Sequence, residues 1–296
     1  MSRFQFLIPV GPGYDPEWLS AAIGSCLSQG PDVGVTLIND GNCADGRHGK
    51  PALVVTLPDF GDNDMEADWG SRVTVIHRKK TGGVAVALND GWQTLGPGVE
   101  FVCRLDADDV CLPNRIASQA SWLRGRPKVL ICGGGIVRMD IPEWEKQKRL
   151  FATFPGSPSN VLRAGHMPLP HPTWMMRKAN LEALLGPRPY SEAYPWAEDF
   201  AMLCQVVKFV GDDALLDISV PLCGHRMHDG RVSHIHKKKQ EHSRGEALKW
   251  FLSLEVKTEE VKDDDVDGDD GAATGDGRVG GDDTPGPDGT DALGGR

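Results

Sequence analysis

Short apolar runs alternate with amphipathic segments through the first half of the chain. The apolar runs are rich in β-branched and aromatic residues and are bounded by Gly, Pro or Asp, which predicts strands at 4–10, 33–39, 73–77 and 100–105. The segments between them repeat apolar residues at helical spacing, which predicts helices at 17–29, 83–95 and 112–124. Strands joined by helical crossovers indicate an α/β fold with a mostly parallel central sheet, flanking helices and a Rossmann-like nucleotide crevice at its carboxyl edge.

The second half of the chain is patterned less regularly. Residues 129–139 predict one or two strands broken by a run of glycines, and residues 140–172, rich in Pro, Trp and charge, predict a long excursion. Further on we expect strands at 173–177 and 214–220, and helices at 178–185, 198–210 and 238–255.

The last segment, residues 258–296, is rich in Asp and Gly and has almost no large apolar side chains. It buries too little surface to offset its chain entropy, so we expect it to be disordered. Residues 259–296 hold 13 acidic and 3 basic residues, which account for the formal net charge of −10. The remainder, with 29 acidic and 29 basic residues, is neutral, and its charge gives no reason to expect stable DNA binding or an anionic membrane as partner.

The seven cysteines form no Cys-x-x-Cys pair and mostly sit in apolar runs, which is typical of reduced, buried thiols. The N-terminal apolar run ends at Pro9 and Val10, too short for a secretory signal. No stretch reaches the ~18 apolar residues of a membrane span. We therefore expect a cytoplasmic protein without a membrane span.

Three carboxylates follow the fourth predicted strand, at Asp106, Asp108 and Asp109. Clustered carboxylates raise one another's pKa unless a cation neutralises them, and hard oxygen ligands at a strand end suit Mg²⁺ or Mn²⁺. The alternative is a cap, in which Asp108 or Asp109 bonds to the first turn of the helix that begins near Pro113. The segment alone leaves both interpretations open.

Two further segments follow predicted strands. Asp40, in an Asn-Asp-Gly sequence, would lie at the carboxyl edge of the sheet, where it can bind a base or a ribose or simply make a turn. Arg78 and Lys79 precede Gly82 and Gly83, which open a helix. Backbone N–H groups at such a helix start, with either cation, can bind a diphosphate, or the segment can be a solvated basic turn.

In their order and spacing, these motifs resemble those of family-2 glycosyltransferases of GT-A fold. The resemblance covers roughly residues 4–233, and loosely it extends to eukaryotic β-1,3-N-acetylglucosaminyltransferase-like members. The matching segments are Ile8-Pro9-Val10, Asn39-Asp40-Gly41, Gly82-Gly83 with Asn89-Asp90-Gly91, Asp106-Ala107-Asp108-Asp109, His171-Pro172-Thr173, Ala197-Glu198-Asp199 and Arg226-Met227-His228. It implies a GT-A domain over residues 1–257, with a nucleotide-sugar half at 1–110 and an acceptor half at 111–257.

The resemblance implies a role for each matching residue. In the nucleotide-sugar half, Pro9 and Val10 would line the nucleoside pocket, Asp40 would bind the base, usually uracil, and Asp106 the ribose or a metal-linked water. Asp108 would ligate Mn²⁺ or Mg²⁺.

In the acceptor half, Asp199 would be the general base, with Glu198 beside it to orient a sugar. The helix dipole at its position would stabilise the anion of Asp199. His228 would be a further metal or diphosphate ligand, and Arg226 would contact the diphosphate, although both can equally be loop residues at the surface.

These roles imply a metal-dependent, inverting transfer of a hexose or N-acetylhexosamine, with UDP as the expected nucleotide, to a glycan, lipid, protein or modified nucleoside. A nucleotidyltransferase acting on sugar phosphates is disfavoured because residues 11–15, after the first strand, contain no basic residue. A catalytically inactive binding protein of the same fold stays open. A basic patch at His234, His236 and 237–239 can dock an anionic acceptor or be a solvated helix start.

Overall fold

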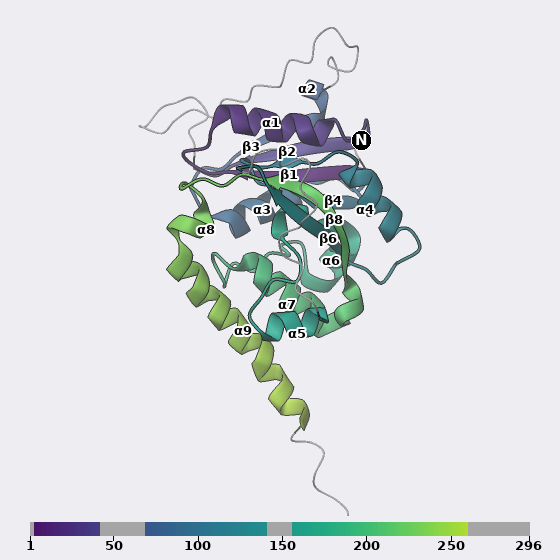
Figure 1. Cartoon of the computed structure of the whole chain (residues 1–296), viewed down its shortest axis with the longest axis vertical. Coiled ribbons are helices and arrows are strands. Elements are labelled where there is room, and N and C mark those ends of the chain that lie inside the picture. The colour runs from purple at the N-terminus through teal and green to yellow at the C-terminus, as the bar shows by residue number, and fades with distance from the viewer. Residues whose placement is uncertain (1–2, 42–68, 141–155, 260–296) are drawn as a thin grey trace, which may run out of the picture.

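The computed structural model describes residues 3–41, 69–140 and 156–259 (Figure 1). The predicted tail at 258–296 lies outside these residues from position 260 onward, and residues 141–155 of the predicted excursion at 140–172 lie outside them as well. The strands are β1 (Phe4–Val10), β2 (Val33–Asn39), β3 (Val73–His77), β4 (Phe101–Arg104), β5 (Val110–Cys111), β6 (Ile131–Arg138), β7 (Met175–Arg177) and β8 (Leu215–His225).

The helices are α1 (Pro16–Leu27), α2 (Trp69–Arg72), α3 (Val84–Gln93), α4 (Arg115–Leu123), α5 (Pro158–Arg163), α6 (Lys178–Leu185), α7 (Glu198–Val210), α8 (Val232–Ile235) and α9 (Lys237–Glu259), with 3₁₀ turns at His171–Thr173 and Asp212–Ala214. The expected α/β fold is confirmed. The short helix α5 and the short strand β5 were not predicted, because too few residues form either of them to show a period.

One eight-stranded sheet organises the molecule, in the order β3-β2-β1-β4-β7-β6-β8-β5. The four strands of the first half are parallel, as predicted, and their register aligns Val10 with Asn39 and Asn39 with His77. The residues that follow β1, β2 and β3 therefore emerge at the same edge of the sheet. Strand β7 is antiparallel to β4 and to β6, so the second half is mixed.

Each face of the sheet has its own apolar core. Along β1, Phe6 and Ile8 pack with α1 and α4, whereas Leu7 packs with α3 and α7 on the other face. This alternation follows from the two-residue period of a strand, and both sides are apolar because helices cover both faces. Figure 1 shows α1 and α3 on opposite sides of the sheet, and α9 running alongside α7.

The glycines in β6 permit a close approach of β8. A Cβ built on Gly134 would come within 2.7 Å of the carbonyl oxygen of Val220, a separation that side chains do not tolerate. The β6–β8 register also shifts between Gly133 and Ile136. The glycine run is thus part of one continuous strand and does not divide it, and β8 extends beyond the predicted end at residue 220 to His225.

Two further expectations concern the cysteines and a membrane span. The six described cysteines are all buried and free, as the apolar surroundings of most of them suggested. No helix within the described ranges is long and apolar enough to cross a bilayer.

Candidate active site

The carboxyl edge of the parallel strands collects the polar residues that were singled out in the sequence. Asn39 and His77, the last residues of β2 and β3, are joined by a side-chain contact of 2.9 Å between Nδ2 and Nδ1. Asp40 follows β2, and its N–H donates to the carbonyl of Val10 at 2.9 Å. The sheet register thus brings Asp40 beside Pro9 and Val10, as expected for a shared pocket.

Asp40 lies in a cradle of donors. Its carboxylate accepts hydrogen bonds from the backbone N–H groups of Gly82 at 2.9 Å and Gly83 at 2.8 Å, and it forms an ion pair with Arg78. The two N–H groups predicted to bind a diphosphate are therefore bound to Asp40, a carboxylate of the chain itself. The same helix start that attracts anions explains this contact.

Arg78 also pairs with Asp90, through Nε and Oδ2 at 2.7 Å. Arg188 holds the other oxygen of Asp90 at 2.9 Å. Burial of Asp90 opposes ionisation, but hydrogen bonds from the two arginines outweigh it and lower the pKa of this carboxyl. Arg78 is thus an internal bridge between β2 and α3, whereas Lys79 next to it is exposed.

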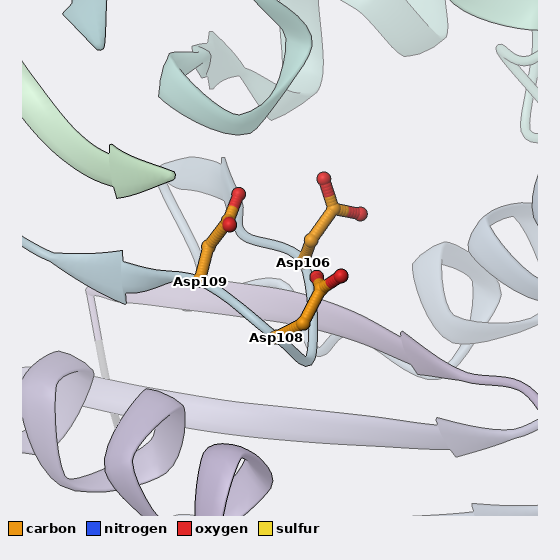
Figure 2. Close-up of side chains that lie close together, drawn as sticks. All are labelled: Asp106, Asp108 and Asp109. Atoms are coloured by element: carbon orange, nitrogen blue, oxygen red, sulfur yellow. The ribbon is translucent and has the colours of Figure 1, made fainter. Parts of the chain in front are cut away.

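Three aspartates lie together in the loop between β4 and β5 (Figure 2). Ligand atoms from Asp106, Asp108 and Asp109 all lie within 4.8 Å of one another. The side chains differ in access, because Asp106 and Asp108 are 35% and 27% exposed and Asp109 is fully buried. The helix-cap alternative is not what the structure shows, since α4 begins after Asn114 without a side-chain cap.

Asp109 connects the aspartate loop to the end of β8. Its carboxylate accepts from the backbone N–H of Arg226 at 2.9 Å and contacts Nδ1 of His225 at 3.0 Å. Burial raises the pKa of Asp109. Burial opposes protonation of His225, but its hydrogen bond to Asp109 outweighs this and raises the histidine pKa. Both groups of the pair therefore bind a proton more readily than they ordinarily do.

Asp108 contacts the other end of the Arg-x-His segment. Its Oδ2 lies 2.7 Å from Nε2 of His228, and its carbonyl accepts from Nε of Arg226 at 3.0 Å. The indole of Trp18 packs against both residues: its centroid lies 4.7 Å from the Arg226 guanidinium carbon and 4.9 Å from the His228 ring. The structure thus brings Asp108, Arg226 and His228 together.

Arg104, the last residue of β4, holds the carboxylate of Asp106 in an ion pair. The guanidinium is buried, pairs with Oδ1 of Asp106 at 2.5 Å and donates to the carbonyl of Leu105. Burial opposes the charge of Arg104, but the charge of Asp106 outweighs it and raises the arginine pKa. Nε of Arg104 is buried without a hydrogen-bond partner among the described residues.

Glu198 and Asp199 begin α7 on the acceptor side. Glu198 is 7% exposed, and burial followed by the charge of Asp199 raises its pKa to about 8. Burial also raises the pKa of Asp199, although Oδ1 accepts from the N–H of Phe200 at 2.7 Å. The helix dipole expected to stabilise the Asp199 anion is therefore outweighed by desolvation. The pair retains a proton more readily than ordinary carboxyls do.

His171 lies in the 3₁₀ turn that precedes β7. Its Nε2 lies 3.1 Å from the hydroxyl of Tyr190. Burial, followed by the nearby charge of Arg104, lowers the pKa of His171 well below its usual range. Arg104 therefore influences the electrostatics of both Asp106 and the acceptor-side residues.

A divalent cation suits part of this site. Asp106 and Asp108 offer partly exposed carboxylate oxygens, and the imidazole of His228, in contact with Asp108, could add a nitrogen ligand. Asp109 is the least accessible of the three, because it is fully buried and both its oxygens contact His225 or Arg226. Oxygen-rich sets with one nitrogen are compatible with Mn²⁺ or Mg²⁺.

Comparison with known proteins identifies the family. The family described as "Glycosyl transferase family 2" matches residues 14–185, more than half of the chain. This chain belongs to glycosyl transferase family 2.

Relatives of this family-2 chain cover only parts of it. It is 33% identical over 78 residues to the amylovoran biosynthesis glycosyltransferase AmsE of Erwinia amylovora, covering 26% of this chain and 29% of AmsE. It is 24% identical over 135 residues to an uncharacterized glycosyltransferase of Haemophilus influenzae, covering 45% of each. The chain therefore spans less than half the length of the curated relatives that it matches.

Solved structures confirm the GT-A type of fold. S. aureus TarS 1-349, solved with UDP-GlcNAc, superposes with a TM-score of 0.52 at 14% identity, covering 87% of this chain and 73% of that one. Glucosyl-3-phosphoglycerate synthase from Mycobacterium tuberculosis, solved with Mn²⁺, UDP and glucosyl-3-phosphoglycerate, gives 0.55 at 12% identity, covering 85% and 80%. At these identities the likeness concerns the fold.

Sequence reasoning missed three residues of this family-2 site. Trp18 lies in the predicted helix 17–29 but was not proposed as a site residue; it is partly exposed in the first turn of α1, which Asp15 caps. Arg104 ends an apolar strand, and a lone charge there was the available signal. His225 lies just before the Arg-x-His segment and past the predicted strand end.

Proposed function

We propose that this family-2 chain is a metal-dependent, inverting glycosyltransferase that moves a hexose or N-acetylhexosamine from a UDP-sugar to an acceptor hydroxyl. One observation carries the proposal. The partly exposed carboxylate of Asp106 lies near enough to the buried Glu198 for its charge to act on that carboxyl, and the charge of Arg104 acts on Asp106 and Glu198 alike. Donor-binding and proton-accepting groups thus share one site.

On the donor side, Pro9, Val10 and Asp40 would bind the nucleoside. The bonds from Arg78, Gly82 and Gly83 fix the Asp40 carboxylate, so it is pre-organised for this contact. TarS 1-349, which has a similar fold, was also solved with UDP, and this supports the choice of nucleotide.

For the leaving group, Asp108, Asp106 and His228 would hold Mn²⁺ or Mg²⁺. The cation, when bound, supplies positive charge to the leaving diphosphate. Arg226, held over Trp18, would add a second positive charge, and Lys79 would add a third from its exposed position.

On the acceptor side, Asp199 would take the proton of the acceptor hydroxyl. That oxygen then forms its bond to the anomeric carbon while the bond from this carbon to the diphosphate oxygen breaks, and the electron pair leaves with the diphosphate. A base opposite the leaving group makes this a single displacement, hence an inversion. Burial suits the role, because a raised pKa brings the carboxylate closer in basicity to the working pH.

A thermal-shift experiment tests the proposal. The melting temperature of the full chain would be measured with UDP, ADP and GDP, each with Mn²⁺ or with EDTA. We expect UDP with Mn²⁺ to give the largest rise in melting temperature. A ligand at a hundredfold excess over its Kd adds about 2.7 kcal/mol to the free energy of unfolding. Equal shifts with all three nucleotides, or a shift unaffected by EDTA, would contradict the proposed donor or the metal.

A further inference from the structure

We propose that the acceptor carries a phosphate group, which is bound by a cationic cluster beside the catalytic pair. The cluster consists of Trp196, His236, Lys239 and Arg244, contributed by the segment before α7 and by the start of α9. This inference rests on the proposed function, because it names the substrate class of the same acceptor site. It accounts for the basic patch of the sequence, to which the transfer reaction itself gives no role.

Trp196 places the cluster next to Glu198 and Asp199, the proposed catalytic pair. It lies two residues before Glu198 and has a φ of 74°, in the left-handed region that bulky side chains rarely adopt. Such backbone is kept only where the surrounding structure imposes it, and it concentrates at functional sites. The strained backbone and the catalytic pair thus belong to one short segment.

The ring of Trp196 is covered by two cationic or titratable groups from the other segment. The His236 ring lies 4.2 Å from it, centroid to centroid, and Nζ of Lys239 lies 5.6 Å from its centroid. Both contacts hold side chains of the α9 start against the entrance to α7. A cation held over this indole places a positive charge beside the entrance to α7, where it can meet an anionic group of a ligand.

The first turn of α9 concentrates positive charge where a helix favours negative charge. Residues 237–239 are all lysines, and the positive end of the helix dipole disfavours each of them. Lys237 is 4.0 Å from Glu241, an exposed pair. Within the described ranges, Lys239 has no carboxylate partner, so helix stability does not explain its position. An anion bound there would be favoured by the lysine and by the dipole together.

Arg244, further along α9, lies against the start of α7. Its guanidinium carbon lies 5.7 Å from the Phe200 ring, and its positive charge acts to lower the pKa of Asp199. In the described part of the chain Arg244 makes no hydrogen bond or ion pair, and its Nε is buried without a partner. A partly exposed guanidinium lacking a carboxylate is available to a phosphate oxygen.

The acidic residues of α9 do not neutralise this cluster. Glu241 faces Lys237, and Glu246 pairs with Lys249 at 2.7 Å further along the helix. The body as a whole holds 29 acidic and 29 basic residues, so the cluster is a local feature and not part of a general excess of positive charge. A local cluster beside a carboxylate base fits a small phosphorylated sugar or polyol better than an extended polyanion.

Binding of paired probes to the full chain tests the inference. Glycerol, sn-glycerol 3-phosphate and glycerophosphoglycerol would each be titrated by calorimetry, with the donor site filled by UDP and Mn²⁺ and again without them. We expect a phosphorylated probe to bind at least about tenfold more tightly than glycerol, as one charge-assisted contact provides. The stronger of the two phosphorylated probes identifies a monoester or a diester.

Lys239→Gln and Arg244→Gln are expected to remove this preference, while UDP binding stays unchanged. The matched control is Lys249→Gln, an exposed lysine of the same helix. Lys239 is exposed, so its variant keeps the test valid if Arg244→Gln misfolds. Equal binding of all three probes, or equal losses in the control, would overturn the inference. Failure of UDP binding with the phosphate preference intact would count against the proposed function alone.

Discussion

The donor half and the acceptor half of this site treat their carboxylates in opposite ways. Asp40 and Asp90 are each held by two or more donors from arginine or backbone N–H groups. Glu198 and Asp199 are buried with little compensation, and both have a raised pKa. Satisfied carboxylates keep fixed positions, whereas desolvated ones retain affinity for a proton. This contrast is what the proposed function requires, because donor binding needs fixed groups and transfer needs a group that can take a proton.

The largest expected effect is a loss of transfer that leaves UDP binding nearly unchanged. Asp199→Asn removes the proton acceptor but keeps the shape of the side chain, so transfer should fall by about 10²–10⁴-fold. UDP binding, which depends on the other half, should be nearly unchanged. Steady-state release of UDP and a calorimetric titration of UDP measure the two quantities. Near-normal turnover would exclude Asp199 as the base.

Asp108→Ala tests the donor half, because it should weaken UDP binding. It removes a metal ligand and the partner of His228, so Mn²⁺-dependent UDP binding should weaken by about 10–100-fold. Titrating UDP at several Mn²⁺ concentrations measures the change. The control is Asp212→Asn, which lies far along the chain and binds Ser159. Binding that keeps its metal dependence would contradict the assignment of Asp108.

Arg104→Lys tests the connection between the halves. Lysine keeps the charge that lowers the pKa of His171 but loses the planar fork that holds Asp106. We expect KM for the donor to rise by about tenfold, the equivalent of one charge-assisted hydrogen bond, with a smaller change in kcat. Kinetics at saturating and limiting donor separate the two. A loss confined to kcat would indicate that Arg104 acts mainly on the acceptor side.

The smallest effect concerns stability and pH. Because the pKa of Glu198 is about 8 in the folded chain and 4.5 ordinarily, the folded state binds more protons between these values, and stability falls as pH rises through this window. Between pH 5 and pH 9, the free energy of unfolding should therefore fall by roughly 2–4 kcal/mol less in Glu198→Gln than in the unaltered chain.

Urea unfolding at the two pH values measures this difference. Glu192→Gln is the control, because hydrogen bonds from Arg188 and Asn89 lower the pKa of Glu192, which is ionised throughout the window. A pH dependence unchanged by Glu198→Gln would show that another group holds the proton.

The two halves also differ in how far the sequence predicts them. The buried parallel strands 4–10, 33–39 and 73–77 were predicted to the residue, because apolar runs between turn signals are enough to define them. The end of β8 and the exposure of Trp18 were not, since both depend on packing against distant segments. The partners of Asp40 and Asp109 lie 38 to 117 positions away, and local patterns carry no information on such pairs.

The bond between Asp109 and His225 spans 116 positions and has a consequence for folding. While the chain is being synthesised, the parallel strands can assemble long before residue 225 exists, yet the aspartate loop then lacks the groups that neutralise its buried carboxylate. Contacts of such high sequence separation form late and slowly. The metal-binding loop should therefore become ordered among the last parts of the molecule, and amide exchange in 105–111 should become protected after that in β1 and β2.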